Sequence, residues 1–264
     1  MKKAKFISVS SGKGGVGKSF VCINMGISMV RAGFKALVID ADIGFANIDV
    51  MLGIHSDNSI SDVADGDKSI DELTVKHSSG LDVLCGGSGL SSSFILTDKN
   101  KDFLLKEMKT ITGNYDYVII DNSAGISKEI TFFSSHSGTN VIILSPDPTS
   151  LTDSYSLIKI LSLDFDIIDY TIIVNQANEE TGNAIFNRIS KVADKYIPIG
   201  NLTYGGAIPK DPDIVECIRS QRTIFEEDID VANSIENTLK KAISKSSNAG
   251  FKPFWQKALS EGLK

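Results

Sequence analysis

The sequence is poor in cysteine and contains no long apolar run. Three of its 264 residues are cysteines, and Cys22, Cys85 and Cys217 lie far apart without a C-x-x-C spacing. This pattern excludes a zinc ribbon and a disulfide framework. No run approaches the roughly 18 apolar residues that a membrane-spanning helix needs, and no signal peptide precedes the first predicted strand. We therefore expect a cytoplasmic protein.

Negative charge predominates, but it is unevenly distributed. The formal net charge is −6, and a hydrophobic content of 42% is typical of a globular protein. From Leu239 to Lys264 there are six lysines and one acidic residue, Glu261, a local charge of +5 that leaves −11 for the rest. An acidic body argues against broad nucleic-acid binding, so we expect no direct contact with nucleic acid.

A glycine-rich loop near the start matches the pattern G-x-x-x-x-G-K-[ST]. It follows the β-rich run Lys5–Val9 and precedes a periodic apolar segment that ends near Gly33, which predicts a strand, a loop and a helix. Backbone N–H groups in such a loop bind phosphate oxygens, helped by the helix N-terminus. We expect Lys18 to reach the β- and γ-phosphates and Ser19 to ligate Mg²⁺. The cofactor-binding residues predicted here are Gly12, Lys13, Gly14, Gly15, Val16, Gly17, Lys18, Ser19 and Phe20.

Strand-like runs alternate with amphipathic helical stretches along the chain. Lys101–Ile111 and Ser150–Leu163 are two of the predicted helices. The pattern predicts an α/β protein with the three-layer P-loop fold, a mostly parallel twisted sheet with helices on both faces. We predict one ATPase domain over 1–248 and a separate C-terminal helix over 249–264. The other predicted strands are Ala36–Asp40, Leu81–Cys85, Tyr117–Asp121, Asn140–Ser145, Tyr170–Asn175 and Ile197–Leu202.

Acidic residues end two of the predicted strands. Asp40 and Asp42 follow one apolar run, and Asp121 follows another. In a parallel sheet the carboxyl ends of the strands share one edge, where the phosphate loop also lies. Asp121 is therefore predicted to hold Mg²⁺ through a water molecule, although an acid at a strand end can also cap a helix.

The loop contains a second lysine, Lys13, and the pattern K-G-G-V-G-K-S resembles the deviant phosphate loop of the MinD/ParA (SIMIBI-class) ATPases. The resemblance implies a homodimer in the ATP state, in which Lys13 reaches the partner's nucleotide as an arginine finger does elsewhere. It also implies that Asp40 supports the magnesium shell and that Asp42 orients the attacking water. Residues 122–125 fall where switch II lies in this family. The predicted catalytic residues are thus Lys13, Lys18 and Asp42, and the predicted metal site is Ser19, Asp40 and Asp121.

The adenine end of the site is less clearly marked. Asn175 closes a predicted strand, and Pro209 and Asp211 follow a predicted Gly-Gly turn. In related ATPases an asparagine in the first position hydrogen-bonds the base, and the second segment lies beside it. Asn175 could equally be a turn residue. No Asn-Lys-x-Asp guanine motif is present, so ATP/ADP is favoured over GTP.

Four segments resemble FlhG/FleN, the MinD-like regulators of flagellar number, and the match runs from about Ala4 to about Ile224. It implies an ATPase that is slow alone and acts with an FlhF-type GTPase, a flagellar transcription activator or basal-body proteins. The D-Q-A-x-x-L-R segment that stimulates FlhF in that family is not present here. The matching segments are Asp40–Gly53, Gly86–Gly89, Asp121–Ser127 and Pro148–Lys159.

Two alternatives to this function stay open. One is cell-division or cargo positioning by a MinD or ParA relative. The other is an anti-activator binding module, gated by nucleotide, that depends little on hydrolysis.

The C-terminal segment has its bulky apolar residues on one face of a predicted helix, with lysines off that face. A short basic amphipathic helix with tryptophan is typical of interfacial membrane binding. We therefore expect reversible peripheral contact with the inner face of the cell membrane; the alternative is a helix docked on its own domain. The membrane-contacting residues predicted here are Phe251, Phe254, Trp255, Leu259 and Leu263.

Overall fold

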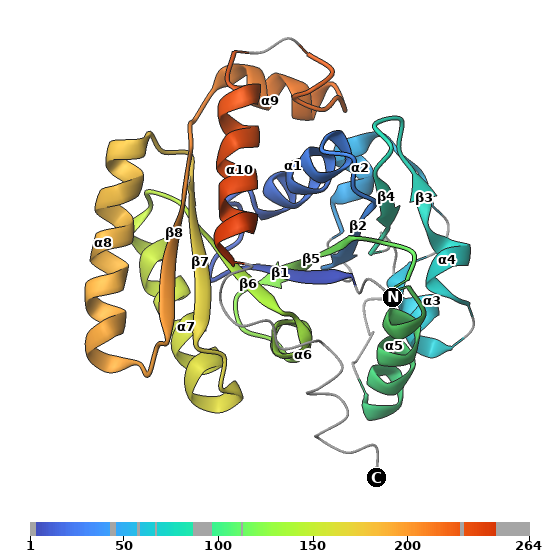
Figure 1. Cartoon of the computed structure of the whole chain (residues 1–264), viewed down its shortest axis with the longest axis horizontal. Coiled ribbons are helices and arrows are strands. Elements are labelled where there is room, and N and C mark those ends of the chain that lie inside the picture. Colours follow the sequence, from blue (N-terminus) through green and yellow to red (C-terminus); the bar gives the residue numbers. More distant parts are fainter. Residues whose placement is uncertain are drawn as a thin grey trace.

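The computed structural model describes residues 4–42, 46–56, 59–66, 68–86, 97–111, 113–227 and 230–246. Its core is an eight-stranded sheet in the order β3-β4-β2-β5-β1-β6-β7-β8 (Figure 1). The β3–β4 pair is antiparallel and the other neighbouring strands are parallel. The strands are β1 (Lys5–Ser11), β2 (Ala36–Ala41), β3 (Val75–Lys76), β4 (Asp82–Leu84), β5 (Tyr117–Ala124), β6 (Thr139–Leu144), β7 (Asp169–Asn175) and β8 (Asn201–Ile208).

Helices cover both faces of the sheet, which confirms the predicted three-layer α/β fold (Figure 1). In the described ranges, no helix is both long enough and apolar enough to cross a bilayer. The helices are α1 (Lys18–Arg31), α2 (Ile48–Leu52), α3 (Ile60–Asp65), α4 (Ile70–Leu73), α5 (Asp98–Ile111), α6 (Lys128–His136), α7 (Pro148–Phe165), α8 (Glu179–Tyr196), α9 (Pro212–Arg219) and α10 (Ala232–Ser246).

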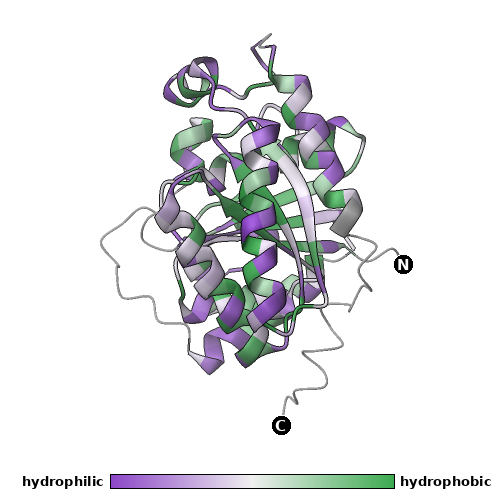
Figure 2. Cartoon of the chain, turned by 90° about the vertical axis from the view of Figure 1, so that its left-hand side faces the viewer, coloured by the Kyte–Doolittle hydropathy of each residue, from purple (hydrophilic) through white to green (hydrophobic). Residues whose placement is uncertain are grey.

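The core is divided by the sheet into two sides. Helices α1, α2, α9 and α10 pack on one face. On the other face, α3, α4 and α5 cover the β2–β5 half and α7 and α8 cover the β6–β7 half, with α6 between them. Figure 2 shows the central strands in green behind helices banded in purple and green, as expected for a sheet buried on both faces.

The topology brings the predicted site residues to one edge. β1 lies between β5 and β6, and β5 lies between β1 and β2. Asp121 on β5 is in register with Val9 on β1 and with Asp40 on β2. The phosphate loop and both acidic strand ends therefore meet at the carboxyl edge of the sheet, as in other open parallel α/β sheets.

The predicted strand over Ile197–Leu202 and the Gly-Gly turn after it are wrong. β8 runs from Asn201 to Ile208, and Gly205 and Gly206 lie inside it. The register to β7 shifts at this point, so the glycines form a β-bulge. A Cβ on Gly205 would lie 3.0–3.1 Å from side-chain atoms of β7 and α10, and Gly206 has φ 134°. The two glycines allow close packing within the strand, and they do not form a turn.

Helix α1 lies close against the sheet at Gly26, where a Cβ would lie 2.7 Å from Leu81 and 2.9 Å from Val38. We expect Gly26→Val to lower the free energy of unfolding by about 2 kcal/mol through overpacking. Ser28 on the same helix is the control, because its buried hydroxyl has no hydrogen-bond partner in the described structure. Ser28→Ala should leave stability unchanged or raise it. Urea unfolding of both variants measures this, and equal losses would contradict the close helix–sheet contact.

Candidate nucleotide-binding site

The phosphate loop joins β1 to α1, and its glycines are required by geometry. Gly15 and Gly17 have φ values of 77° and 86°, which side chains disfavour. A Cβ on Gly17 would lie 2.1 Å from the Asn175 amide nitrogen, and one on Gly12 would lie 2.2 Å from the α7 backbone. Gly17 is the N-cap of α1 and has no side chain to cap it, so the first N–H groups of the helix stay available to an anion.

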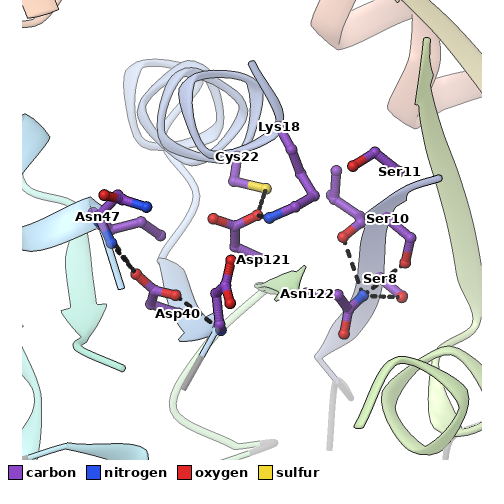
Figure 3. Close-up of polar contacts among 12 residues, drawn as sticks. Ser8, Ser10, Ser11, Lys18, Cys22, Asp40, Asn47, Asp121 and Asn122 are labelled. Carbon is purple, nitrogen blue, oxygen red and sulfur yellow. Dashed lines mark hydrogen bonds and ion pairs between the residues drawn. The ribbon is translucent and has the colours of Figure 1, made fainter. Parts of the chain in front are cut away.

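Lys18 and Asp121 form a buried ion pair beneath this loop, 7% and 0% exposed (Figure 3). Burial lowers the pKa of Lys18, but the charge of Asp121, its hydrogen bond to Lys18 and the effects of Cys22 and Asp40 together outweigh burial, and the net shift is upward. The Cys22 thiol donates to the same carboxylate oxygen at 3.4 Å, and burial raises the pKa of Cys22 well above its ordinary value. The pair thus presets a protonated lysine at the place where phosphates are expected.

The site chemistry fits Mg²⁺. Asp121 Oδ2 is buried and has no hydrogen-bond partner among the described residues. The Ser19 hydroxyl belongs to the first turn of α1, next to Lys18, and is half-buried. A hydroxyl, an unused carboxylate oxygen and phosphate oxygens are the hard oxygen donors that Mg²⁺ prefers.

Asp40, near the end of β2, bonds to backbone N–H groups just after β2 and at the start of α2. It is 1% exposed and accepts three backbone N–H groups, from Asp42 at 3.0 Å, Asn47 at 3.1 Å and Ile48 at 3.2 Å. Burial, reinforced by the charge of Asp121, raises the pKa of Asp40 to about 7. Asp42 is only half-buried; burial raises its pKa while Lys18 lowers it, with a net rise. Asp40 therefore holds the backbone at Asp42 and at Asn47–Ile48, and the Asp42 side chain stays half-exposed.

Lys13 contacts its own chain on the α7 side. Its Nζ lies 2.8 Å from Asp147 Oδ2 and 2.6 Å from Thr149 Oγ1. Asp147 also caps α7 by accepting the Thr149 N–H at 2.7 Å. The hydrogen bond from Lys13 and those from Thr149 hold the pKa of Asp147 well below its usual range. Sequence reasoning missed both partners, although an acid before Pro148 is a recognisable helix-start signal.

An open cleft of about 320 Å³ lies beside the loop and contains further residues that the sequence did not indicate. Gln176 and Lys210 line it together with Lys13, and Gln176 has a left-handed backbone (φ 60°). A non-glycine residue in this region often marks a functional site. No local sequence motif marks either residue, because they meet only through the ends of β7 and β8.

The predicted adenine residues lie at this end of the site. Asn175 is buried, and its amide donates to the Val16 carbonyl at 2.8 Å. Pro209 follows the last residue of β8, and Asp211 caps α9 by accepting the Asp213 N–H at 2.8 Å. Asn175 therefore holds the phosphate loop, and its predicted contact with the base stays a prediction.

The two remaining predictions have different outcomes. The Phe20 side chain is 5% exposed and packs in the core between α1 and α9, so a contact with the cofactor would come from its backbone. The membrane-contacting residues and the domain boundary before them stay predictions, and all five residues, from Phe251 to Leu263, lie outside the described residues.

Comparison with known proteins agrees with this geometry. The family described as "AAA domain" matches residues 4–163. The antiactivator FleN of Pseudomonas aeruginosa is 30% identical over 86% of this chain and 81% of its own. The flagellum site-determining protein YlxH of Helicobacter pylori is 31% identical over 97% of this chain and 90% of its own. A MinC:MinD cell division complex from Aquifex aeolicus superposes with a TM-score of 0.73 at 28% identity, covering 91% of this chain and 96% of the other.

Fold and site define a P-loop ATPase of the MinD/ParA class. Within that class the chain belongs to the MinD-like family that includes the flagellar regulators FleN and YlxH. The resemblance inferred from Lys13 and the four matching segments is confirmed.

Without metal and nucleotide, Asp40 should make stability depend on pH. Its ordinary pKa of 3.8 is raised to about 7 in the folded state, so the folded protein binds the extra proton and loses stability as pH rises from 4 to 7. The effect is on the order of a few kcal/mol. In EDTA, the difference in free energy of unfolding between Asp40→Asn and wild type should shift in favour of Asp40→Asn as the pH rises from 4 to 7. Exposed Asp98→Asn is the control, and parallel pH profiles for wild type and Asp40→Asn would contradict the raised pKa.

Proposed function

We propose that this protein is a nucleotide switch, monomeric with ADP and a sandwich dimer with ATP, that regulates flagellar number or placement. The observation that carries the proposal is Lys13. Within its own loop, Lys18 already occupies the place below the phosphates, whereas Lys13 is held on Asp147 and Thr149. That contact is easily exchanged, because the side chains of Lys13 and Asp147 are 40% and 44% exposed.

Hydrolysis would use the residues at the sheet edge. Lys18 would leave Asp121 to bind the β- and γ-phosphates, while Ser19 and the free oxygen of Asp121 would hold Mg²⁺, which neutralises phosphate charge when bound. Asp42, accessible beside Asp40, would orient the attacking water. Lys13 from the second subunit would stabilise the charge that develops on the transferred phosphoryl group. We expect the reaction to be slow without a partner protein.

The hydrogen-bonding of the Asn175 side chain supports adenine as the base. One of its two N–H groups donates to the Val16 carbonyl, and its Oδ1 would accept a hydrogen bond from the base. An acceptor suits the 6-amino group of adenine and disfavours the 6-oxo group of guanine. Pro209 and Asp211, at the start of α9, would flank the base.

The names of the relatives support the flagellar output. FleN is called an antiactivator and YlxH a flagellum site-determining protein. An FlhF-type GTPase, a flagellar transcription activator and basal-body proteins are therefore the proposed partners, with peripheral membrane contact through 249–264. Division-site or cargo positioning is supported less well by these relatives.

The first test is the molecular mass in solution. With a non-hydrolysable ATP analogue, wild type should double its mass from 28.5 kDa, and with ADP it should not. Lys13→Ala should stay monomeric, because the cross-subunit contact is lost. Lys210→Ala, which removes the second lysine of the same cleft, is the matched control and should still dimerise. Light scattering measures this, and a wild type that stays monomeric with the analogue would overturn the switch.

The same measurement tests the contact that Lys13 makes in the monomer. Asp147→Ala frees Lys13, so the variant should dimerise at a protein concentration several-fold lower than wild type does. An unchanged or higher concentration would mean that Asp147 does not compete with the partner subunit.

The second test separates a hydrolytic switch from an anti-activator that needs only nucleotide binding. Asp42→Ala should bind ATP within about threefold of wild type and hydrolyse it at least tenfold more slowly, since water positioning acts on the chemical step. In a null strain this variant should fail to restore normal flagellar number. Lys18→Ala, expected to lose nucleotide binding, is the control. Full restoration by Asp42→Ala would favour the anti-activator module.

A further inference from the structure

A layer of buried polar side chains lies between the sheet and α6, on the face opposite α1. Ser8 and Ser10 on β1, Asn122 on β5 and Ser134 on α6 are each 1% exposed, and Asn140 on β6 is 7% exposed. Elsewhere the buried side chains of this face of the sheet are mostly apolar. An unsatisfied buried polar group costs about 1–3 kcal/mol, and the Asn122 and Asn140 carbonyl oxygens have no partner in the described part of the chain. Such a layer calls for an explanation.

Asn122 is the centre of this layer. Its amide nitrogen lies 2.8 Å from Ser8 Oγ, 2.9 Å from Ser10 Oγ and 3.0 Å from the Val9 carbonyl (Figure 3). All three acceptors are on β1, the strand that runs into the phosphate loop. Ser8 in turn shares a 3.0 Å hydrogen bond with Ser134. One side chain thus joins the end of β5 to the end of β1, and through Ser8 to α6.

The backbone explains why this joint is needed. Val9 pairs with Asp121, but Ser11 pairs with Ala124, so β5 has one more residue than β1 between these pairs. This is a β-bulge, which interrupts the ladder between the two strands. Asn122 lies in the bulge, and its side-chain amide donates to the Val9 carbonyl across it. Bulges of this kind re-aim neighbouring side chains and are common beside active sites.

The bulge sets the direction of two functional groups. Asp121, just before it, faces α1 and pairs with Lys18. Gly125, just after it, donates its N–H to the Ser11 carbonyl at 3.0 Å, which places switch II against the phosphate loop. A shift of β5 along β1 would displace both at once.

We propose that Asn122 is a positioning residue for ATP hydrolysis: it fixes the bulge that aims Asp121 at the magnesium site and Gly125 at the phosphate loop. It acts through these two residues, since its own hydrogen bonds are made to β1. The inference rests on the ATPase activity proposed above. Both displaced groups serve the γ-phosphate end, so the loss should fall on hydrolysis and on the preference for ATP over ADP, more than on nucleotide binding in general.

Asn140 offers a matched control in the same protein. It is a buried asparagine of the same polar layer, it pairs with Ser8 from the other side of β1, and its carbonyl oxygen has no partner among the described residues. Asn122→Ala should lower kcat at least tenfold, reduce the preference for ATP over ADP several-fold and change the Kd for ADP less than threefold. Asn140→Ala should keep kcat and the ATP preference within twofold of wild type. Thermal unfolding of both variants shows whether the losses of stability are comparable.

A milder variant keeps the proposal testable if Asn122→Ala does not fold. Asn122→Ser retains a hydroxyl that can donate one hydrogen bond to β1. Its kcat should therefore be at least threefold below that of wild type and, where Asn122→Ala folds, above that of Asn122→Ala. A kcat of Asn122→Ser equal to wild type would overturn the proposal, as would equal losses in Asn122→Ala and Asn140→Ala. A wild type that does not hydrolyse ATP would instead overturn the proposed function.

Discussion

The buried pair of Lys18 and Asp121 is the interaction on which the rest of the site depends. Removing two charges from water is costly and is offset only by close pairing and further hydrogen bonds. Here the pair is supported by the Cys22 thiol, and it joins α1 to β5 directly below the phosphate loop. Burial, and then the charge of this carboxylate, raises the pKa of Asp40 on the next strand. The site is therefore a set of interacting charges that phosphates and Mg²⁺ would rearrange.

Around this pair, two side chains hold the neighbouring backbone through hydrogen bonds. On the β2 side, Asp40 accepts three N–H groups and shapes the segment that begins with Asp42. On the β1 side, the Asn122 amide bridges the bulge before switch II. Buried polar side chains are costly unless paired, but when paired they specify one arrangement. The segments that follow β2 and β5 are thus anchored to the sheet at their first residues.

Helix α7 contains one of the four segments that resemble flagellar regulators, and it lies against the phosphate loop. Its cap, Asp147, and its first turn hold Lys13, and a little further on its backbone contacts Gly12 so closely that no side chain would fit. The Gly12 N–H also donates to Ser154 at 3.3 Å. The Pro148–Lys159 segment therefore supports the phosphate loop, so its similarity to flagellar relatives carries information about the nucleotide site as well as about partners.

The phosphate loop, the alternating α/β order and the acidic strand ends could all be predicted from the sequence alone. These features are local: a strand, a glycine turn and a helix lie within about 25 residues, and their periodicity identifies them. From the parallel topology that they imply, the meeting of Asp40, Asp121 and the loop at one edge also followed.

The groups that these residues contact could not be predicted in this way, because they come from distant parts of the chain. Lys13 meets Asp147 across 134 positions, Asn175 meets Val16 across 159, and Asn122 meets Ser10 across 112. The sequence predicted a turn at Gly205 and Gly206. They form a bulge instead, because β7 and α10 approach too closely for side chains. Local patterns carry no information about such distant neighbours, whose positions depend on strand order and on packing between layers.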